Sequence, residues 1–267
     1  MTLLAPGDAR ILSGGTDFYP AQGERVVRDR IVDVSDLGEL RGISRDGDFL
    51  RIGGLTTWSD IVRAPLPRGF DALKSAAREV GSVQIQNRGT VAGNLCNASP
   101  AADGVPPLLV LDAEVELASN AGTRRMALAE FIVGNRKTQR QRDELLTAVL
   151  VPRALENAAS SFVKLGARRY LVISIAMVAA VIQTDDAGRV AEARAAVGSC
   201  SAVARRLPAL EAALTGTAAG DGFSGRVRRE HLAPLSPIDD VRATGEYRMD
   251  AALTLIERAL NQCVGMG

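Results

Sequence analysis

Two glycine-rich segments carry the residue types that bind phosphate groups. The first, Leu12-Ser13-Gly14-Gly15-Thr16-Asp17, follows a short apolar stretch and ends in a hydroxyl and a carboxylate. Paired glycines let backbone N–H groups turn toward an anion, because no Cβ stands in the way. The segment therefore suits a phosphate. The same residues also fit a tight turn in which Thr16 and Asp17 cap a helix.

The second segment, residues 81–103, is dense in amides, hydroxyls and small residues. Few protein cores have this composition, because each buried polar group needs a hydrogen-bond partner. A polar ligand would satisfy these groups, and the glycines would let it approach the backbone closely. A surface loop with Asn and Gly turns is the structural alternative. The residues that carry the ligand-binding interpretation are Gly89, Thr90, Gly93, Asn94, Asn97 and Ser99.

Two other features look functional but lack the context that their chemistry needs. Residues 220–225 match GxGxxG, yet they follow a predicted helix at 203–214, whereas the dinucleotide fingerprint needs a strand before the glycines. No GxxxxGK[ST] loop exists in the sequence, which excludes ATP hydrolysis by that route. His231, the single histidine, lies in a polar stretch and is expected at the surface or as a cap.

The three cysteines, Cys96, Cys200 and Cys263, are widely spaced and form no CxxC pair. They are typical of reduced thiols in the cytoplasm. Three cysteines cannot complete a four-thiolate iron–sulfur cluster, and one histidine cannot build a multi-histidine metal site, so redox metals are assigned to a partner. Cys96 lies in the second glycine-rich segment and is a candidate to line a cofactor cavity.

Composition excludes several classes of protein. The 267 residues carry a net charge of +1, which gives no electrostatic case for nucleic acid or an anionic membrane. Hydrophobic residues make up 46% and charged residues 24%, an ordinary globular mix. The longest apolar run, residues 171–182, is shorter than the roughly 20 residues that span a bilayer. The N-terminus does not resemble a secretory signal, so we expect a cytoplasmic protein without a membrane span.

The elements that must position these residues change in character near residues 152–159. Upstream, the pattern predicts short strands at 31–34, 43–44, 49–52, 114–117 and 145–151, with helices from Thr56 or Thr57 through Val62 and at 71–80. Downstream it predicts longer strands at 161–165, 173–182 and 190–197, which suggest an antiparallel sheet. Helices are predicted at 203–214 and 249–260, with a weaker segment at 226–232. The pattern predicts an α+β fold in two parts.

Five motifs resemble those of one known family. Residues 12–17 are similar to its first FAD-binding motif, and Ile52-Gly53-Gly54-Leu55-Thr56-Thr57 resembles its IGAxTT signature. Residues 84–94 and 97–103 resemble its QIRNxGTxGGNxxNASPxxD segment. Residues 164–169 and 240–248 look like its C-terminal signatures. The chain thus resembles the FAD-binding medium subunit of molybdenum hydroxylases, the xanthine dehydrogenase and aerobic carbon monoxide dehydrogenase family.

This resemblance implies a domain plan. Residues 1–153 would form a PCMH-type FAD-binding domain of two α+β subdomains, about 1–55 and 56–153. Residues 159–267 would form the family's C-terminal domain, an antiparallel sheet with helices.

The resemblance also implies how FAD binds. The diphosphate would lie against residues 13–17 and the Thr90 region, and Asp103 would hold a ribitol or ribose hydroxyl. Ile85 and Cys96 would flank the cofactor, while Lys164 would approach the isoalloxazine and stabilise the reduced anionic flavin. No residue is assigned as a catalytic acid, base or nucleophile. The predicted cofactor-binding set is Leu12, Ser13, Gly14, Gly15, Thr16, Asp17, Phe18, Ile85, Thr90, Gly93, Asn94, Cys96, Asn97, Ala102, Asp103 and Lys164.

Two residues depart from the family pattern. Gln86 stands where the family usually has Arg, and Ala92 where it has the first Gly of GGN. The Ala92 methyl group is expected to crowd the diphosphate. The chain also begins closer to the first motif than its relatives do.

The implied function is that of an electron-relay oxidoreductase subunit in a heterotrimer. A molybdenum-cofactor large subunit would hydroxylate the substrate, a 2Fe–2S small subunit would pass single electrons, and FAD would deliver pairs to NAD⁺, oxygen or a quinone. Two alternatives stay open. One is a stand-alone FAD-dependent oxidoreductase, against which the scarcity of histidine and tyrosine argues. The other is an assembly subunit that has lost FAD.

Overall fold

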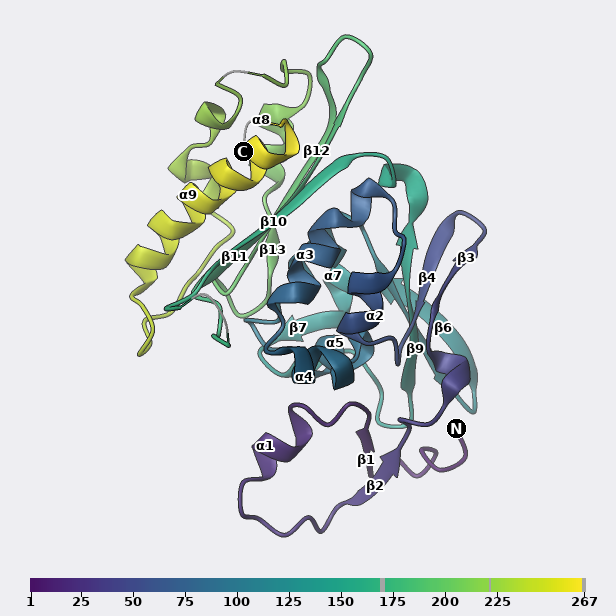
Figure 1. The fold of residues 1–267 in the computed structure, drawn as a ribbon. Coiled ribbons are helices and arrows are strands. Elements are labelled where there is room, and N and C mark those ends of the chain that lie inside the picture. The colour runs from purple at the N-terminus through teal and green to yellow at the C-terminus, as the bar shows by residue number, and fades with distance from the viewer. Residues whose placement is uncertain (169–170, 221, 266–267) are drawn as a thin grey trace.

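The computed structural model describes residues 1–168, 171–220 and 222–265. Arg169 of the 164–169 motif and Asp221 of the GxGxxG match lie outside these residues. Helices and largely antiparallel strands are mixed along the chain, which confirms the predicted α+β class. Figure 1 shows two sheets with their helices and a smaller N-terminal unit beside them.

The N-terminal unit contains a two-stranded parallel sheet of β1 (Ala9–Leu12) and β2 (Arg30–Asp33), with α1 (Phe18–Gln22) between them in sequence. Figure 1 shows it at the bottom, in purple. Its small apolar core joins distant parts of the chain: Leu4, Val34, Leu55 and Leu145. The glycine turn at residues 13–15 follows β1 directly and is therefore held at the edge of this unit.

A five-stranded antiparallel sheet forms the middle of the molecule. Its order is β3 (Ile43–Asp46), β4 (Phe49–Gly53), β9 (Leu145–Pro152), β5 (Glu114–Ser119) and β6 (Gly122–Ala127). The central strand β9 is buried from Leu145 to Val151, which explains why Thr147 is the one polar residue in that stretch. The strands predicted at 43–44 and 49–52 are confirmed as β3 and β4, which pair antiparallel as a hairpin. Strand β4 lies before residue 55 and strand β9 lies after it, and the two strands pair. This sheet therefore contains strands from both predicted subdomains, about 1–55 and 56–153.

Helices cover this sheet, and their caps can be read from the sequence. Thr57 caps α2 (Trp58–Arg63) through a capping box with Asp60, and the predicted helix at 71–80 is α3 (Asp71–Glu79). The polar segment 81–103 folds mostly into helices rather than a loop, because Ser82 and Thr90 accept from backbone N–H groups at two helix starts. The remaining elements here are α4 (Val83–Arg88), α5 (Val91–Asn97), α6 (Val105–Val110), α7 (Leu128–Phe131), η1 (Gly38–Leu40), η2 (Arg68–Phe70), η3 (Arg153–Leu155), β7 (Ile132–Gly134) and β8 (Lys137–Thr138).

The second large sheet is antiparallel, with the order β10 (Ala159–Leu165), β11 (Ala176–Thr184), β12 (Val190–Gly198) and β13 (Arg205–Arg206). Helix α9 (Gly245–Cys263) packs on this sheet, and its apolar residues share one core with β11 and β12. Helix α3 of the preceding part contacts β10. The predicted antiparallel sheet and C-terminal helix are therefore confirmed. Helix α8 (Pro208–Leu214) and two short turns, η4 (Ser224–Arg226) and η5 (Arg229–Leu232), complete this region.

Two local predictions were wrong at their boundaries. The strand predicted from residue 173 begins at Ala176. The helix predicted from residue 203 begins at Pro208, because a proline suits the first turn of a helix. The residues before it, Arg205 and Arg206, form strand β13, which pairs with β12. His231 is buried and has the second of its two predicted roles, that of a cap: its Nδ1 accepts from the Arg228 N–H at 3.1 Å.

Candidate cofactor site

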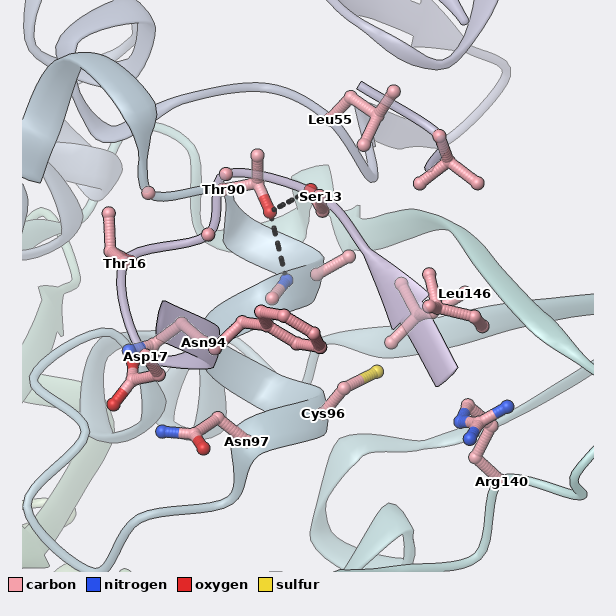
Figure 2. Close-up of a pocket in the computed structure, with 18 of the residues that line it drawn as sticks. Ser13, Thr16, Asp17, Leu55, Thr90, Asn94, Cys96, Asn97, Arg140 and Leu146 are labelled. Atoms are coloured by element: carbon pink, nitrogen blue, oxygen red, sulfur yellow. Dashed lines mark hydrogen bonds between the residues drawn. The ribbon is translucent and has the colours of Figure 1, made fainter. Parts of the chain in front are cut away.

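A cavity of about 1100 Å³ separates the N-terminal unit from α5 and the β7–β8 hairpin. This volume slightly exceeds the usual range for small-molecule sites, roughly 300–1,000 Å³. The cavity is therefore large enough for an extended ligand such as a dinucleotide. Figure 2 shows the polar residues gathered along α5 and the glycine turn.

Most of the predicted cofactor-binding residues line this one cavity. They come from two segments that are far apart in sequence, and the structure brings them together. Leu12, Ala102, Asp103 and Lys164 are not among the residues that line it. Those that do are Ser13, Gly14, Gly15, Thr16, Asp17, Phe18, Ile85, Thr90, Gly93, Asn94, Cys96 and Asn97.

The turn at Gly14–Gly15 packs directly against the end of α4. A Cβ at Gly14 would come within 1.8 Å of the Arg88 carbonyl oxygen, so no larger residue fits without moving the backbone. Gly15 has a φ of +74°, in the left-handed region that favours glycine. The double glycine is thus required both for close approach and for the turn itself.

A pair of hydroxyl groups joins the two glycine-rich segments. Ser13 Oγ lies 3.0 Å from Thr90 Oγ1, across 77 residues of sequence. Thr90 Oγ1 also accepts from the Gly93 N–H at 3.0 Å and so caps α5 (Figure 2). This contact places the backbone of the first segment beside the start of α5.

The residues present fit a cofactor that carries phosphates and hydroxyls. The buried Oδ1 of Asn94 has no hydrogen-bond partner among the described residues, and Asn94 lines the cavity. A buried acceptor without a donor is costly, so a ligand hydroxyl or amine would complete it. A Cβ at Gly93 would lie 2.8 Å from Thr90 Oγ1, so this wall is kept open by glycine.

Ala92 is accommodated by a small neighbour. Its side chain lines the cavity but is only 8% exposed, and its N–H donates to the Gly54 carbonyl at 3.1 Å. A Cβ at Gly54 would lie 3.2 Å from the Ala92 Cβ, so the methyl group of Ala92 faces the space that Gly54 leaves free. Part of the surface of the Ala92 methyl group therefore packs against the protein.

Asp103 and Lys164 pair with each other. The Lys164 Nζ lies 2.7 Å from Asp103 Oδ2, and the two side chains are 6% and 8% exposed. The Ser174 hydroxyl donates to Asp103 Oδ1 at 2.6 Å, and Lys164 also donates to the Glu79 carbonyl at 3.1 Å. Burial raises the pKa of the Asp103 carboxyl, and Lys164 opposes this shift. Their predicted roles toward FAD stay predictions.

Cys96 lies on α5 and faces the cavity. Burial raises the pKa of its thiol to about 11, against a smaller opposing effect of Arg140. The thiol is therefore neutral at physiological pH, which suits a wall of a binding site better than a nucleophile.

Sequence reasoning missed one whole wall of the cavity. The β7–β8 hairpin and the residues after it contribute Val133, Arg136, Lys137, Thr138 and Arg140. The local sequence offered only a basic, polar run, which is typical of a solvated surface. Apolar residues that contribute to the wall elsewhere are Val34, Leu40, Leu55, Val80, Leu145 and Leu146.

A glycine turn and a hydroxyl-capped helix that face one large cavity are typical of a phosphate-binding site in an α+β protein. Comparison with family models places it more narrowly. The model described as "FAD binding domain in molybdopterin dehydrogenase" matches residues 1–154, and that described as "CO dehydrogenase flavoprotein C-terminal domain" matches residues 161–263.

Individual relatives agree with these matches. The chain is 39% identical to the nicotinate dehydrogenase FAD-subunit of Eubacterium barkeri over 67% of this chain and 62% of that protein. It is 31% identical to a putative xanthine dehydrogenase FAD-binding subunit of Escherichia coli over 96% of this chain and 89% of that protein. Among solved structures, a chain of carbon monoxide dehydrogenase from Hydrogenophaga pseudoflava superposes with a TM-score of 0.91 at 26% identity, covering 99% of this chain and 93% of that one.

The chain therefore belongs to the FAD-binding subunits of the molybdenum hydroxylase family, and it is an oxidoreductase component whose cofactor is FAD. Several relatives are named as subunits or chains of larger dehydrogenases. No helix among the described residues is long and apolar enough to cross a bilayer.

Proposed function

We propose that this chain relays electrons within a molybdenum hydroxylase complex. Electrons would arrive from the 2Fe–2S clusters of a small partner subunit and leave to an acceptor such as NAD⁺ or a quinone. Substrate oxidation would take place on a molybdenum-cofactor large subunit. Bound FAD supplies the exchange between single electrons and electron pairs, and the residues of this chain bind it, orient it and exclude water.

The observation that carries this proposal is the convergence of the two glycine-rich segments on one cavity. The contact of Ser13 Oγ with Thr90 Oγ1, at 3.0 Å, holds the glycine turn against the start of α5. We propose that residues 13–17, with Thr90, Gly93 and Asn94, hold the diphosphate. No group of three or more histidine, cysteine, aspartate or glutamate side chains suited to a metal ion occurs in the described part of the chain.

We also propose the domain plan and the location of the protein. Residues 1–153 would form the FAD-binding domain and residues 159–267 the C-terminal domain. The five-stranded and four-stranded sheets, which lie on either side of residues 153–158, support this division. The three cysteines are free thiols, which supports a location in the cytoplasm.

The proposal is tested by purifying the chain alone and with its co-expressed partner subunits. We expect the complex, loaded with FAD, to reduce an acceptor when the substrate of the large subunit is added, and the isolated chain to be inactive. Metal analysis should find iron and molybdenum only in the partner subunits. Sustained NADH or alcohol oxidation by the isolated chain would contradict the relay and favour a stand-alone oxidoreductase.

A further inference from the structure

Arg248 is a buried arginine of the C-terminal region that does not line the cofactor cavity. It lies in the first turn of α9, and its side chain is 3% exposed. Figure 1 shows this end of α9 beside the four-stranded sheet, where β11 begins and β12 ends. Burying an arginine costs more than burying an apolar side chain of similar volume, because the charge loses its hydration. The contacts of the guanidinium show what Arg248 holds in place.

The guanidinium joins three segments that are far apart in sequence. Its Nη1 donates to the Ile175 carbonyl at 2.6 Å and to the Ser199 carbonyl at 3.3 Å. Its Nη2 lies 2.7 Å from Asp240 Oδ1. The Arg242 N–H, together with the Arg248 guanidinium, lowers the pKa of Asp240 to about 2, so this carboxylate stays ionised. The start of β11, the residue after β12 and the turn before α9 are thus held by one side chain.

Two of these segments contact the end of the second glycine-rich segment. The Ser199 N–H donates to the Pro100 carbonyl at 3.0 Å. Ser174 directly precedes Ile175, and its hydroxyl donates to Asp103 Oδ1 at 2.6 Å. Pro100 and Asp103 follow α5, which contributes several residues to the wall of the cavity. The guanidinium therefore holds the backbone that contacts residues 100–103.

Stability alone does not account for this arrangement. Nε of Arg248 and Oγ of Ser199 are buried, and neither has a hydrogen-bond partner among the described residues. Each such group loses its hydration without compensation, so a cluster selected only for stability would satisfy both. Ser199 also has a φ of +64°, which is unfavourable for a residue with a side chain. Unsatisfied groups and backbone strain of this kind are concentrated at functional sites.

Asp103 links this cluster to the flavin half of the proposed cofactor site. Its carboxylate pairs with Lys164, which is predicted to approach the isoalloxazine. We propose that Arg248 is a positioning residue for FAD, which acts through Ser174 on this ion pair and does not itself contact the cofactor. Arginine suits this role because its planar fork donates to several acceptors in fixed directions. The inference rests on the proposed FAD site, because it concerns the residues that face the flavin there.

The test measures FAD and ADP affinity by calorimetry, with the purified, flavin-free chain. We expect Arg248→Lys to weaken FAD binding about fivefold, as for the loss of one hydrogen bond, and to leave ADP binding unchanged because ADP lacks the flavin. Lysine keeps the charge beside Asp240 but cannot donate in the fixed directions of a guanidinium. The visible circular dichroism of bound FAD should change as well.

Arg229→Lys is the matched control for this variant. Arg229 also pairs with α9, at 2.6 Å from Asp250 Oδ1, but its side chain is 60% exposed and lies outside the cavity wall. It should leave both affinities and the spectrum of bound FAD unchanged.

A double variant tests the route through Ser174. Ser174→Ala removes the hydroxyl that donates to Asp103, and it should weaken FAD binding about as much as Arg248→Lys does. If Arg248 acts through Ser174, combining the two changes should add little to either loss. Additive losses would show that the two residues act independently and would overturn the inference.

The remaining outcomes separate this inference from the proposed FAD site. Unchanged FAD affinity in Arg248→Lys overturns the inference, as does an equal loss for FAD and ADP, which would show a general loosening of the cavity. If the wild-type chain binds neither FAD nor ADP, the proposed FAD site is itself wrong and the inference falls with it. Should Arg248→Lys melt below the assay temperature, Asp240→Asn decides, because it removes the ion pair of Arg248: a selective loss of FAD affinity supports the inference, and unchanged FAD affinity overturns it.

Discussion

The cavity differs from the junction between the two large sheets in how buried polar groups find hydrogen-bond partners. At the junction, Lys164 and Asp103 satisfy each other at 2.7 Å, and Ser174 completes the carboxylate at 2.6 Å. In the cavity, the buried Oδ1 of Asn94 has no partner among the described residues, and Arg140 forms no ion pair there. The Lys164–Asp103 pair is thus satisfied within the protein, whereas Asn94 Oδ1 in the wall of the cavity is not.

A second cluster strengthens the junction. Arg206 lies 2.8 Å from Asp112 and also donates to the Leu109 carbonyl at 3.3 Å. Arg194 donates to the Val110 carbonyl at 3.2 Å and pairs with Asp112. These arginines, from β12 and β13, reach the C-terminal end of α6, where cations stabilise free carbonyl groups. Changes at the junction should therefore mainly affect stability, and changes in the cavity should mainly affect ligand affinity.

The largest effect is expected at the junction, from Lys164→Met. It leaves the Asp103 carboxylate buried without its cation, which costs about 3–5 kcal/mol in the free energy of unfolding. Burial raises the pKa of Asp103, so stability in this variant should fall as pH rises through the folded pKa. Urea denaturation at several pH values measures this.

The double variant Asp103→Asn, Lys164→Met is the control for that prediction, because it removes both charges. It should recover part of the lost stability and abolish the added pH dependence. An additive loss from the two single changes would show that the pair is not coupled.

In the cavity, Gly14→Ala should lower FAD affinity with little change in global stability. The added Cβ would lie 1.8 Å from the Arg88 carbonyl oxygen, so the turn must move away from α4. Strain of about 2 kcal/mol corresponds to roughly thirtyfold weaker binding. Gly38→Ala is the matched control, because a Cβ there meets nothing within 4 Å. Equal FAD affinity in the two variants would contradict the assigned turn.

Thr90→Val tests the contact that joins the two segments. It removes the hydroxyl beside Ser13 and the cap of α5, at a cost of about 1 kcal/mol. FAD binding should weaken severalfold, and Thr90→Ser should restore it because serine keeps the hydroxyl. Titration with FAD and thermal unfolding of the two variants measure both effects.

The smallest effect concerns the reactivity of Cys96. Burial raises the pKa of its thiol to about 11, so its alkylation rate should rise about tenfold per pH unit between pH 7 and 10. FAD or ADP should slow this reaction, because Cys96 lines the cavity. Cys200 and Cys263, which are buried in the core beside α9, serve as internal controls in mass spectrometry. Ligand-independent labelling of Cys96 would place the ligand elsewhere.

The parts of the site that could be predicted from sequence are those whose chemistry is local. The Gly14–Gly15 turn and the Thr90 cap depend on adjacent residues, so the residue types at these positions predict the local geometry. The strand β9 was also predicted from its local sequence, which is apolar from Leu145 to Val151 except at Thr147.

The parts that escaped prediction depend on contacts between distant residues. Arg140 belongs to a basic run that is typical of a surface, and only the tertiary fold turns it toward the cavity. The ion pair of Asp103 and Lys164 joins residues 61 positions apart, so it could not be predicted from the local sequence. The helices within residues 81–103 were not predicted, because α4 and α5 are short, at six and seven residues.

The most direct test of the account is a titration of the purified, flavin-free chain with FAD, followed by visible absorption. The account predicts saturation at one FAD per chain with a shifted flavin band, and markedly weaker uptake in Gly14→Ala than in Gly38→Ala. Absence of FAD uptake by the wild-type chain, even with its partner subunits present, would contradict the claim that the two glycine-rich segments together form the binding site.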